Sequence, residues 1–499
     1  MAAARRGDFS GRCGLLQVCA SPGLPPGDLL TCSFPSREAC YALRRVPRAI
    51  QVGLNTAASG PVSIEWQWFS SRERTMSENT QPASFETLTA RLATAMLAGP
   101  FDELALKSRC KKLFERSPRW VGPLINRVLD AFGAGQRPYA EKLISFLRAD
   151  RRLATNWSKR RVPVRSCAVE SQFAPATSRF ERWRLPEIHS VGHLAEWLNL
   201  DVGHLEWFAD RKQLGRFDGV GRLCHYRYCW QRKRHGRVRL IEAPKSRLKE
   251  IQRRLLGDIF SRIPVHEAAH GFRPGRSVLS FTAPHIGKAV VLKLDLSDFF
   301  PSTSPARLIH LLMAAGYPEE VARTITGLCT NSAPHAIWRD FPDVSNPDLR
   351  WQCRQLYQAP HFPQGAPTSP AIANLCSFRL DQRLAGLARV ADASYTRYAD
   401  DLLFSGDRQF ARSIGTFKAQ VAAIVLLEGH QVNHHKTRVM FQSQRQIAAG
   451  VVLNDRPNVS RTEFDRLKAT LHQAARSGPE SQNHEQHPNF RSHLLGRIQ

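Results

Sequence analysis

The sequence predicts an α+β fold over residues 191–454, because strand-like and helical runs alternate there. The apolar run at 290–294 is rich in β-branched residues and indicates a buried strand. A helix ended by Gly429 is indicated by apolar residues that recur at steps of four and three. These residues are Phe410, Ile414, Phe417, Val421 and Ile424. At 499 residues and 42% hydrophobic, the chain is long enough for two or more domains.

The charge of the chain is strongly positive. Lys and Arg number 71 against 43 Asp and Glu, which gives a formal net charge of +28. Such an excess increases self-repulsion in the folded state, so a polyanionic partner is expected, and nucleic acid fits best. A merely soluble basic protein is the alternative interpretation.

Signals for membranes, export and zinc are weak. No stretch reaches the ~18 to 20 apolar residues that span a bilayer, and no apolar segment precedes a small-residue cleavage site. The eleven cysteines lack paired metal-ligand spacing, so Cys224 and Cys229 are expected to be free, buried thiols. We therefore expect a cytoplasmic protein with no membrane partner.

Residues 1–75 differ from the rest of the chain. They hold four of the cysteines, several Pro and Gly, and no sustained hydrophobic period. Met76 opens a polar start that runs into an amphipathic helix. We hypothesise that Met76 is the true start and that residues 1–75 are translated upstream sequence; a disordered extension is the alternative.

Residues 76–165 are predicted to form a basic helical N-terminal module and linker. Apolar residues at helical spacing indicate three helices around Leu88, Leu92 and Met96, then Leu124, Val128 and Phe132, then Leu143, Ile144 and Leu147. Residues 151–190, rich in Arg, Ser and Pro, are interpreted as linker. The tail, 455–499, offers one helix around Thr462–Ala475.

Aspartates lie at the ends of two strand-like segments. Asp295 lies near the exit of the apolar strand, where a carboxylate is costly unless it is paired with a cation; a turn or helix cap is the alternative. Apolar residues flank Asp400 and Asp401 in SYTRYADDLLFS (394–405), which suggests a hairpin with both carboxylates at its tip. A solvated Asp-rich turn is the alternative, and the apolar flanks disfavour it.

Three such carboxylates on neighbouring strands have the chemistry of a two-metal site. Hard cations such as Mg²⁺ take oxygen ligands and keep water or phosphate oxygens in their shell. Two of them can stabilise the attacking hydroxyl and the leaving pyrophosphate of an in-line displacement. Spacing in the sequence does not prove this arrangement.

Six segments resemble, in the same order, the sequence boxes of reverse transcriptases. They are KRHGRVRLIEAP (233–244), HGFRPGRS (270–277), LDLSDFFPS (294–302), FPQGAPTSPAIAN (362–374), YADD (398–401) and GHQVNHHKT (429–437). The resemblance implies a right-hand polymerase fold after the N-terminal module. Fingers are expected over 166–290, a palm with a ferredoxin-like antiparallel sheet over 291–454, and a short or truncated helical thumb over 455–499.

The resemblance also implies roles for individual residues. Asp295, Asp400 and Asp401 would hold two Mg²⁺ ions, with Mn²⁺ as a substitute, joined by the backbone carbonyl of Leu296. Lys436 would neutralise or protonate the leaving pyrophosphate. The deoxynucleoside triphosphate would contact Phe300 beneath its sugar, Gln364 and Gly365 at the start of a helix, and Arg239 at its phosphates. Arg273 and Arg276 would touch template or nucleotide. The alternatives are a solvated side chain for Lys436, a core residue for Phe300, a simple turn for Gln364 and Gly365, and a salt-bridged strand residue for Arg239.

Within that family the chain looks most like the bacterial retron type, which copies a structured non-coding RNA into single-stranded DNA and defends against phage. This implies an RNA template, a DNA product and a toxin or effector protein as partners. Two elements associated with recognition of the cognate RNA diverge: the stretch at 281–285 keeps only His285, and Ala448-Ala449-Gly450 replaces a VTG triplet. Another defence reverse transcriptase, a group II intron maturase, and a catalytically idle RNA-binding scaffold are the alternatives.

Overall fold

The computed structural model describes residues 84–498 apart from 166–170, 218–220, 234–236, 344–346 and 485. Helices and strands are mixed along the chain, which confirms the predicted α+β class. The proposed start at Met76, and residues 1–75 before it, lie outside the described residues.

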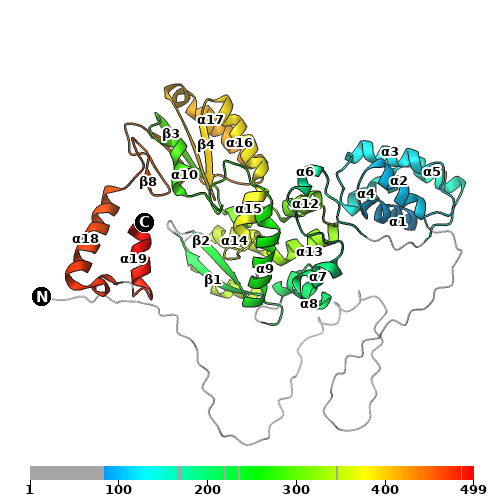
Figure 1. Ribbon diagram of the computed structural model, residues 1–499, viewed down its shortest axis with the longest axis horizontal. Coiled ribbons are helices and arrows are strands. Elements are labelled where there is room, and N and C mark those ends of the chain that lie inside the picture. The colour runs from blue at the N-terminus through cyan, green and yellow to red at the C-terminus, as the bar shows by residue number, and fades with distance from the viewer. Residues whose placement is uncertain are drawn as a thin grey trace, which may run out of the picture. The chain divides into compact units, whose positions relative to one another are not determined.

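Five helices form the module that ends near residue 165. They are α1 (Phe85–Leu97), α2 (Glu103–Lys112), α3 (Val121–Phe132), α4 (Ala140–Ala149) and α5 (Arg151–Lys159). Their apolar residues bury one another, and Leu88, Leu124 and Leu143 are each 0% exposed. The four-residue spacing in the sequence therefore identified the buried faces correctly (Figure 1).

Helix α5 corrects the prediction that residues 151–190 are a linker. Leu153 and Trp157, four residues apart, are buried in the cluster of the module. The carboxylate of Asp150 caps the helix by accepting the Leu153 N–H, and it also pairs with Arg127 (Nε–Oδ2 2.7 Å). Only two apolar positions mark this helix, and the basic residues around them hid the signal.

A second buried cluster lies among helices from the middle of the chain. Its elements are α7 (Val191–Leu198), α8 (Val202–Ala209), α9 (Ser246–Asp258), α12 (Pro305–Ala315), α13 (Glu319–Cys329) and α15 (Ser369–Cys376). Shorter helices complete this region: α6 (Ser178–Glu181), η3 (Leu214–Arg216), η5 (Phe260–Arg262) and α11 (Phe299–Ser302).

An antiparallel hairpin, β1 (Tyr226–Arg232) and β2 (Val238–Pro244), stands beside this cluster. Trp230 of β1 packs against Trp338, in the 3-10 helix η7 (His335–Asp340), and against Tyr357 of α14 (Pro347–Gln358). These contacts attach the hairpin firmly along one side.

The sheet that carries the predicted carboxylates has four antiparallel strands in the order β4-β5-β3-β6. Their bounds are β3 (Val290–Asp295), β4 (Ser394–Tyr398), β5 (Asp401–Gly406) and β6 (Arg438–Phe441). Strand β3 is therefore more than a hundred residues away in the sequence from β5 and β6, the strands on either side of it, whereas β4 and β5 are consecutive.

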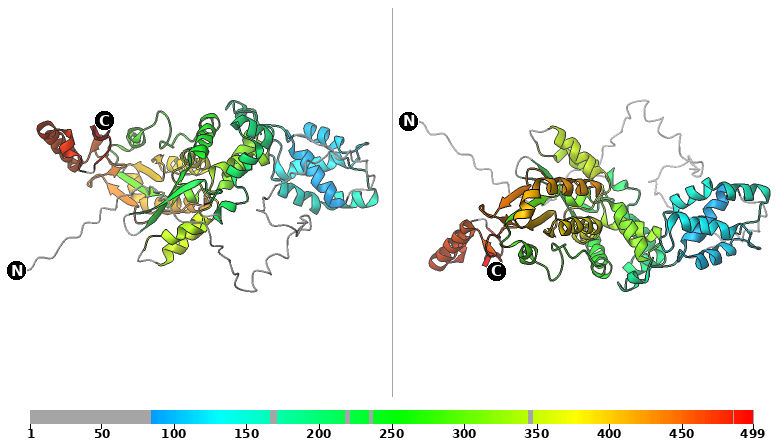
Figure 2. Two further views of the ribbon diagram at one scale, coloured as in Figure 1. Left: turned by 90° about the horizontal axis from the view of Figure 1, so that it is seen from below. Right: turned by 90° about the horizontal axis from the view of Figure 1, so that it is seen from above.

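Both faces of this sheet are covered, because alternate strand residues point to opposite sides. Leu292 and Phe404 pack with Phe417 of α17 (Arg408–Leu427), and α16 (Phe378–Val390) lies on the same side. Val291 and Leu403 pack on the other side. Their neighbours there belong to α10 (Val278–Thr282) and η6 (Ala283–His285). Figures 1 and 2 show α16 and α17, yellow to orange, running along the strands.

The chain then forms a small three-stranded sheet and two helices. The elements are β7 (Ile447–Ala448), β8 (Val451–Val452), β9 (Asn458–Val459), α18 (Arg461–Ser477), η8 (Pro479–Gln482) and α19 (Phe490–Ile498). Helix α18 matches the one predicted around Thr462–Ala475.

One helix within the described residues, α17, is long and apolar enough to cross a membrane by length and composition. The apolar period in the sequence predicted this helix but not as a possible membrane span, because Arg and Lys residues lie among its apolar ones. Its buried residues Phe410, Phe417, Val421 and Val425 pack against the four-stranded sheet.

Candidate active site

The structure brings Asp295 and Asp401 together although 105 positions separate them in the sequence. They are register partners at one end of the β3–β5 pair. The N–H of Leu296 donates to the carbonyl of Asp400 at 2.8 Å. Asp295, the residue before Leu296, therefore lies beside the turn that carries Asp400. Three carboxylates therefore gather at one end of the sheet.

A two-residue turn, Ala399–Asp400, connects β4 to β5, as the sequence predicted. Ala399 has φ +55°, in the left-handed region that favours glycine. The residue is buried, and its carbonyl accepts a hydrogen bond from Arg397 at 3.1 Å. The turn is thus held in a conformation that it would not adopt freely.

The acidic cluster carries more negative charge than its burial favours. Burial raises the pKa of the Asp400 carboxyl above its ordinary value, and the charges of Asp295 and Asp401 raise it further. Burial also raises the pKa of Asp401, against an opposing effect of Lys293. A cation bound between them would favour the ionised form of both carboxyls and lower their pKa values.

Two lysines supply positive charge in the structure. Lys436 Nζ lies 2.8 Å from Asp295 Oδ2, and Lys293 Nζ lies 2.9 Å from Asp401 Oδ2. The family resemblance predicted a role for Lys436 at the leaving pyrophosphate but not that it pairs with Asp295. It missed Lys293, although Lys293 and Asp295 share a face of β3 as residues two apart.

Asn433 fixes Asp295 in two ways. Its backbone N–H donates to the Asp295 carbonyl at 2.7 Å, and its side-chain Nδ2 lies 3.1 Å from Asp295 Oδ1. The asparagine matched a family box in the sequence, yet only the structure gives it a partner.

The donor set suits a hard divalent cation in its chemistry: one buried carboxylate, Asp295, and two partly buried ones, Asp400 and Asp401, whose pKa values are raised. Within the described ranges, however, no three His, Cys, Asp or Glu side chains are already arranged to hold a metal ion. Lysine ammonium groups occupy two of the three carboxylates instead. A metal ion would therefore have to displace them.

Phe299 and Phe300 take different roles. Phe299 is buried in the core under the sheet, whereas Phe300 is only partly buried. The ring of Phe300 lies 6.0 Å from that of Phe272, in the loop that carries Arg273. The partly exposed ring is the one predicted to lie beneath the sugar.

Gln364 and Gly365 form a turn; the prediction that they begin a helix is wrong, because α15 starts only at Ser369. Gly365 has φ +133°, and a Cβ there would lie 2.8 Å from the carbonyl oxygen of Glu242 on β2. The carbonyl of Gln364 accepts the Glu242 N–H at 2.9 Å. Glycine is thus required for the close approach of this turn to β2.

A buried ion pair lies beneath that turn. His361 Nε2 is 2.7 Å from Glu242 Oε2, and Asn331 donates to Oε1 of the same carboxylate at 2.8 Å. Burial acts to lower the pKa of His361, but the charge and hydrogen bond of Glu242 raise it overall. The sequence carried no signal for this pair.

The arginines predicted to contact nucleotide or template lie on β2 and in the loop before α10. Arg239 Nε and Arg273 Nη1 are buried and have no hydrogen-bond partner. Arg276 is exposed, and its N–H donates to the carbonyl of Arg273. Unsatisfied buried guanidinium nitrogens of this kind are suited to an anionic ligand.

His285 is a structural residue, which argues against a contact with RNA. It is 0% exposed, and its ring nitrogens lie 2.7 Å from Ser405 Oγ and 2.8 Å from Thr396 Oγ1. Burial lowers the pKa of His285 to about 3, so the ring is neutral and joins β4 to β5.

The six cysteines within the described residues are free thiols, as predicted for Cys224 and Cys229. Cys224 is buried as expected, but Cys229 is exposed, so the expected burial is wrong for Cys229. Burial raises the pKa of Cys329 and Cys376 to about 12 each. These thiols pack in the core.

Comparison with known proteins shows which family the chain belongs to. The family model for reverse transcriptase (RNA-dependent DNA polymerase) matches residues 231–467. Retron Mx65 reverse transcriptase of Myxococcus xanthus is 38% identical over 403 residues, covering 74% of this chain and 90% of that protein. Retron Mx162 reverse transcriptase of the same organism is 36% identical over 310 residues, 59% of this chain and 61% of that protein. Retron Ec86 reverse transcriptase of Escherichia coli is 29% identical over 237 residues, 47% and 65% respectively.

Fold, site and matches together define an RNA-directed DNA polymerase, a nucleotidyltransferase. Within that class, the chain belongs to the retron-type reverse transcriptases. The divergent elements at 281–285 and 448–450 do not remove it from that group.

Proposed function

We propose that Asp295, Asp400 and Asp401 hold two Mg²⁺ ions, or Mn²⁺ in their place, and that this site joins deoxynucleotides into DNA. The register pairing of Asp295 with Asp401 beside Asp400 is the observation that carries the proposal. The ions would polarise the attacking hydroxyl and neutralise the leaving pyrophosphate. The backbone carbonyl of Leu296 is the fourth protein ligand in this proposal.

Residues of the chain prepare the site for the ions. Lys436 and Lys293 balance the charge of Asp295 and Asp401 before metal binds. Lys436 is 58% exposed at its side chain, so it can move away from Asp295. It is then available to protonate the pyrophosphate oxygen.

The incoming nucleotide is proposed to lie between the acidic cluster and the β1–β2 hairpin. Arg239 would bind its phosphates, with Arg273 and Arg276 beside nucleotide or template. Lys233 lies near Arg239 and Lys436. Burial lowers the pKa of Lys233, the charge of Asp298 raises it, and the charges of Arg239 and Lys436 lower it. Phe300 would lie under the sugar, and the Gln364–Gly365 turn, held to Glu242, would supply a further wall.

In right-hand terms, we propose the four-stranded sheet as the palm within 291–454. The hairpin and the helices of 166–290 correspond to the fingers, and α18 and α19 within 455–499 to the thumb. The helices of 76–165 form the N-terminal module. Their buried faces support packing as its role.

The template is proposed to be a structured RNA, gripped mainly through phosphate and 2′-hydroxyl contacts. The net charge of +28 supports this. We extend the proposal to a role in anti-phage defence with a toxin or effector protein. Expression of the locus should reduce the number of phage plaques, and Asp400→Asn should abolish that reduction. Equal plaque numbers with the wild-type protein and Asp400→Asn would contradict a role in defence.

Primer extension tests the central proposal. The wild-type protein, with Mg²⁺, an RNA template and deoxynucleotides, should extend a primer. Asp400→Asn and Asp401→Asn should each lose more than ~100-fold in rate, since each removes a metal ligand, while RNA binding survives. Near-normal synthesis by both variants would refute the assignment. RNA binding without synthesis by the wild type would favour a catalytically idle scaffold.

A further inference from the structure

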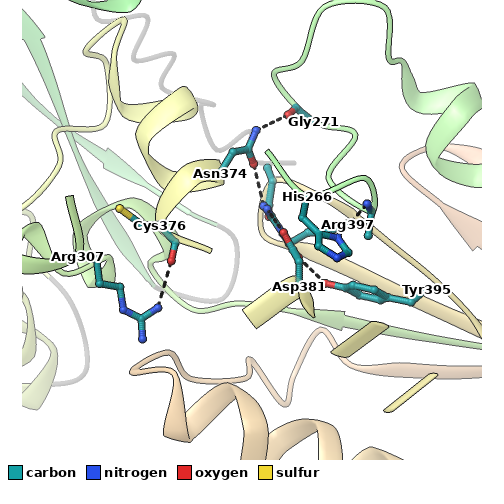
Figure 3. Close-up of polar contacts among 10 residues, drawn as sticks. His266, Gly271, Arg307, Asn374, Cys376, Asp381, Tyr395 and Arg397 are labelled. Carbon is teal, nitrogen blue, oxygen red and sulfur yellow. Dashed lines mark hydrogen bonds and ion pairs between the residues drawn. The ribbon is translucent and has the colours of Figure 1, made fainter. Parts of the chain in front are cut away.

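Arg397, three residues before Asp400, is wholly buried together with its charge partner. Its Nε and Nη2 donate to Asp381 Oδ1 and Oδ2, both at 2.7 Å, and both side chains are 0% exposed. Its Nη1 donates to Asn374 Oδ1 at 2.9 Å and to the Ala399 carbonyl at 3.1 Å. Figure 3 shows Arg397 drawn between Asp381 and Asn374.

The bond to Ala399 reaches the turn that carries Asp400. Ala399 has φ +55°, which an L-residue rarely adopts. A hydrogen bond from a buried guanidinium to the carbonyl of this residue stabilises that conformation. Arg397 is therefore linked directly to the backbone that sets where the Asp400 and Asp401 carboxylates lie.

The hydrogen-bond network of Arg397, Asp381 and Asn374 also fixes the loop that contains Arg273 and Arg276. Asn374 Nδ2 donates to the Gly271 carbonyl at 2.8 Å, so one asparagine bridges Arg397 and this loop. The backbone N–H of Arg397 donates to Ala268 (2.7 Å), and its carbonyl accepts the His270 N–H (2.8 Å).

Gly271 touches the turn itself. A Cβ at this position would lie 2.6 Å from the backbone nitrogen of Ala399, closer than real Cβ atoms come to such an atom. The loop and the turn are thus in backbone contact, and the Arg397 network joins them from both sides.

Stability alone gives little reason for such an arrangement. A buried ion pair contributes no more than well-packed apolar residues of the same volume would, because both charges lose their hydration. What a fully hydrogen-bonded guanidinium adds is fixed geometry for every group it contacts.

We propose that Arg397, Asp381 and Asn374 act as positioning residues that hold the Ala399–Asp400 turn in its metal-binding conformation and fix the 271–276 loop against it. The proposal rests on the proposed function, since it assigns these residues to the metal site. In this proposal none of them touches the metal or the substrate. Arg397 acts on the backbone of the turn and Asn374 on that of the loop, and Asp381 acts through Arg397.

Asn374→Ala is the sharpest test, because it removes both bridging hydrogen bonds and leaves the Arg397–Asp381 pair intact. The Mg²⁺ concentration for half-maximal primer extension should rise about tenfold, as when the support of a metal ligand is lost. Tyr395→Phe is the matched control. It removes one hydrogen bond to Asp381 (2.8 Å) without a contact to the turn or loop, and should keep the wild-type Mg²⁺ requirement.

Gly271→Ala disturbs the backbone contact between the loop and the Ala399–Asp400 turn. It leaves the Arg397–Asp381 ion pair and Asn374 in place. It should also raise the Mg²⁺ requirement, with Mn²⁺ restoring part of the rate in both variants. Should Asn374→Ala and Gly271→Ala melt at lower temperature yet keep the wild-type Mg²⁺ dependence, the network is only structural and the inference is wrong. An inactive wild-type protein would instead count against the metal site itself.

Discussion

Lys293 Nζ lies 2.9 Å from Asp401 Oδ2, so an ammonium group stands where the proposed function requires a metal ion to bind. Lys436 has the same relationship to Asp295. Both lysines stabilise carboxylates that would otherwise repel one another, and both compete with a divalent cation for the same oxygens.

Lys293→Met should tighten Mg²⁺ binding. Removing a positive charge beside the site lowers its repulsion of Mg²⁺, and we expect the half-saturating concentration to fall on the order of 3- to 10-fold. Titration of primer extension with Mg²⁺ measures this, with Lys293→Arg as the charge-retaining control. A higher Mg²⁺ requirement in Lys293→Met would show that the lysine is needed to orient Asp401.

The rate should fall on the acid side at a higher pH than an ordinary aspartate would give. Burial and the neighbouring carboxylates raise the pKa of Asp400, so it takes up a proton before a solvated Asp does as pH falls. Metal binds only the ionised form, so more Mg²⁺ should shift the acid limb to lower pH. Profiles of rate against pH at two Mg²⁺ concentrations test this; coincident profiles would contradict it.

Asp400→Asn should stabilise the metal-free protein. A carboxyl whose pKa is raised in the folded state destabilises that state once it is ionised, so at neutral pH its removal relieves a penalty. In EDTA the variant should have a higher Tm than the wild type. Mg²⁺ should raise the Tm of the wild type and have little effect on the variant. A lower Tm in EDTA would mean that Asp400 supports the turn.

Phe300→Ala should relax the discrimination against ribonucleotides. If the ring fills the space of the 2′-hydroxyl, its loss should reduce the preference for deoxynucleotides by roughly 10- to 200-fold. Single-nucleotide incorporation with dGTP and GTP gives the ratio. Phe299→Leu is the control, since Phe299 packs in the core and its change should lower Tm without altering the ratio. An unchanged ratio in Phe300→Ala would end the assignment.

Local patterns in the sequence determined the elements of this protein. Apolar alternation and period predicted the β3 strand, the β4–β5 hairpin and α17, because both signals depend only on neighbouring residues. The order of the family boxes predicted the class of enzyme, which the comparisons confirm. The same method missed α5, where two apolar positions were too few to form a period.

Tertiary structure decided the pairings. The register of Asp295 against Asp401, the burial of Phe299 rather than Phe300, and the lysine partners of the carboxylates all depend on strands far apart in the chain. Nothing within a few residues of Arg397 shows that its partners are Asp381 and Asn374. Such contacts follow from how helices and strands pack to bury their apolar faces, and a one-residue shift in register would exchange every partner.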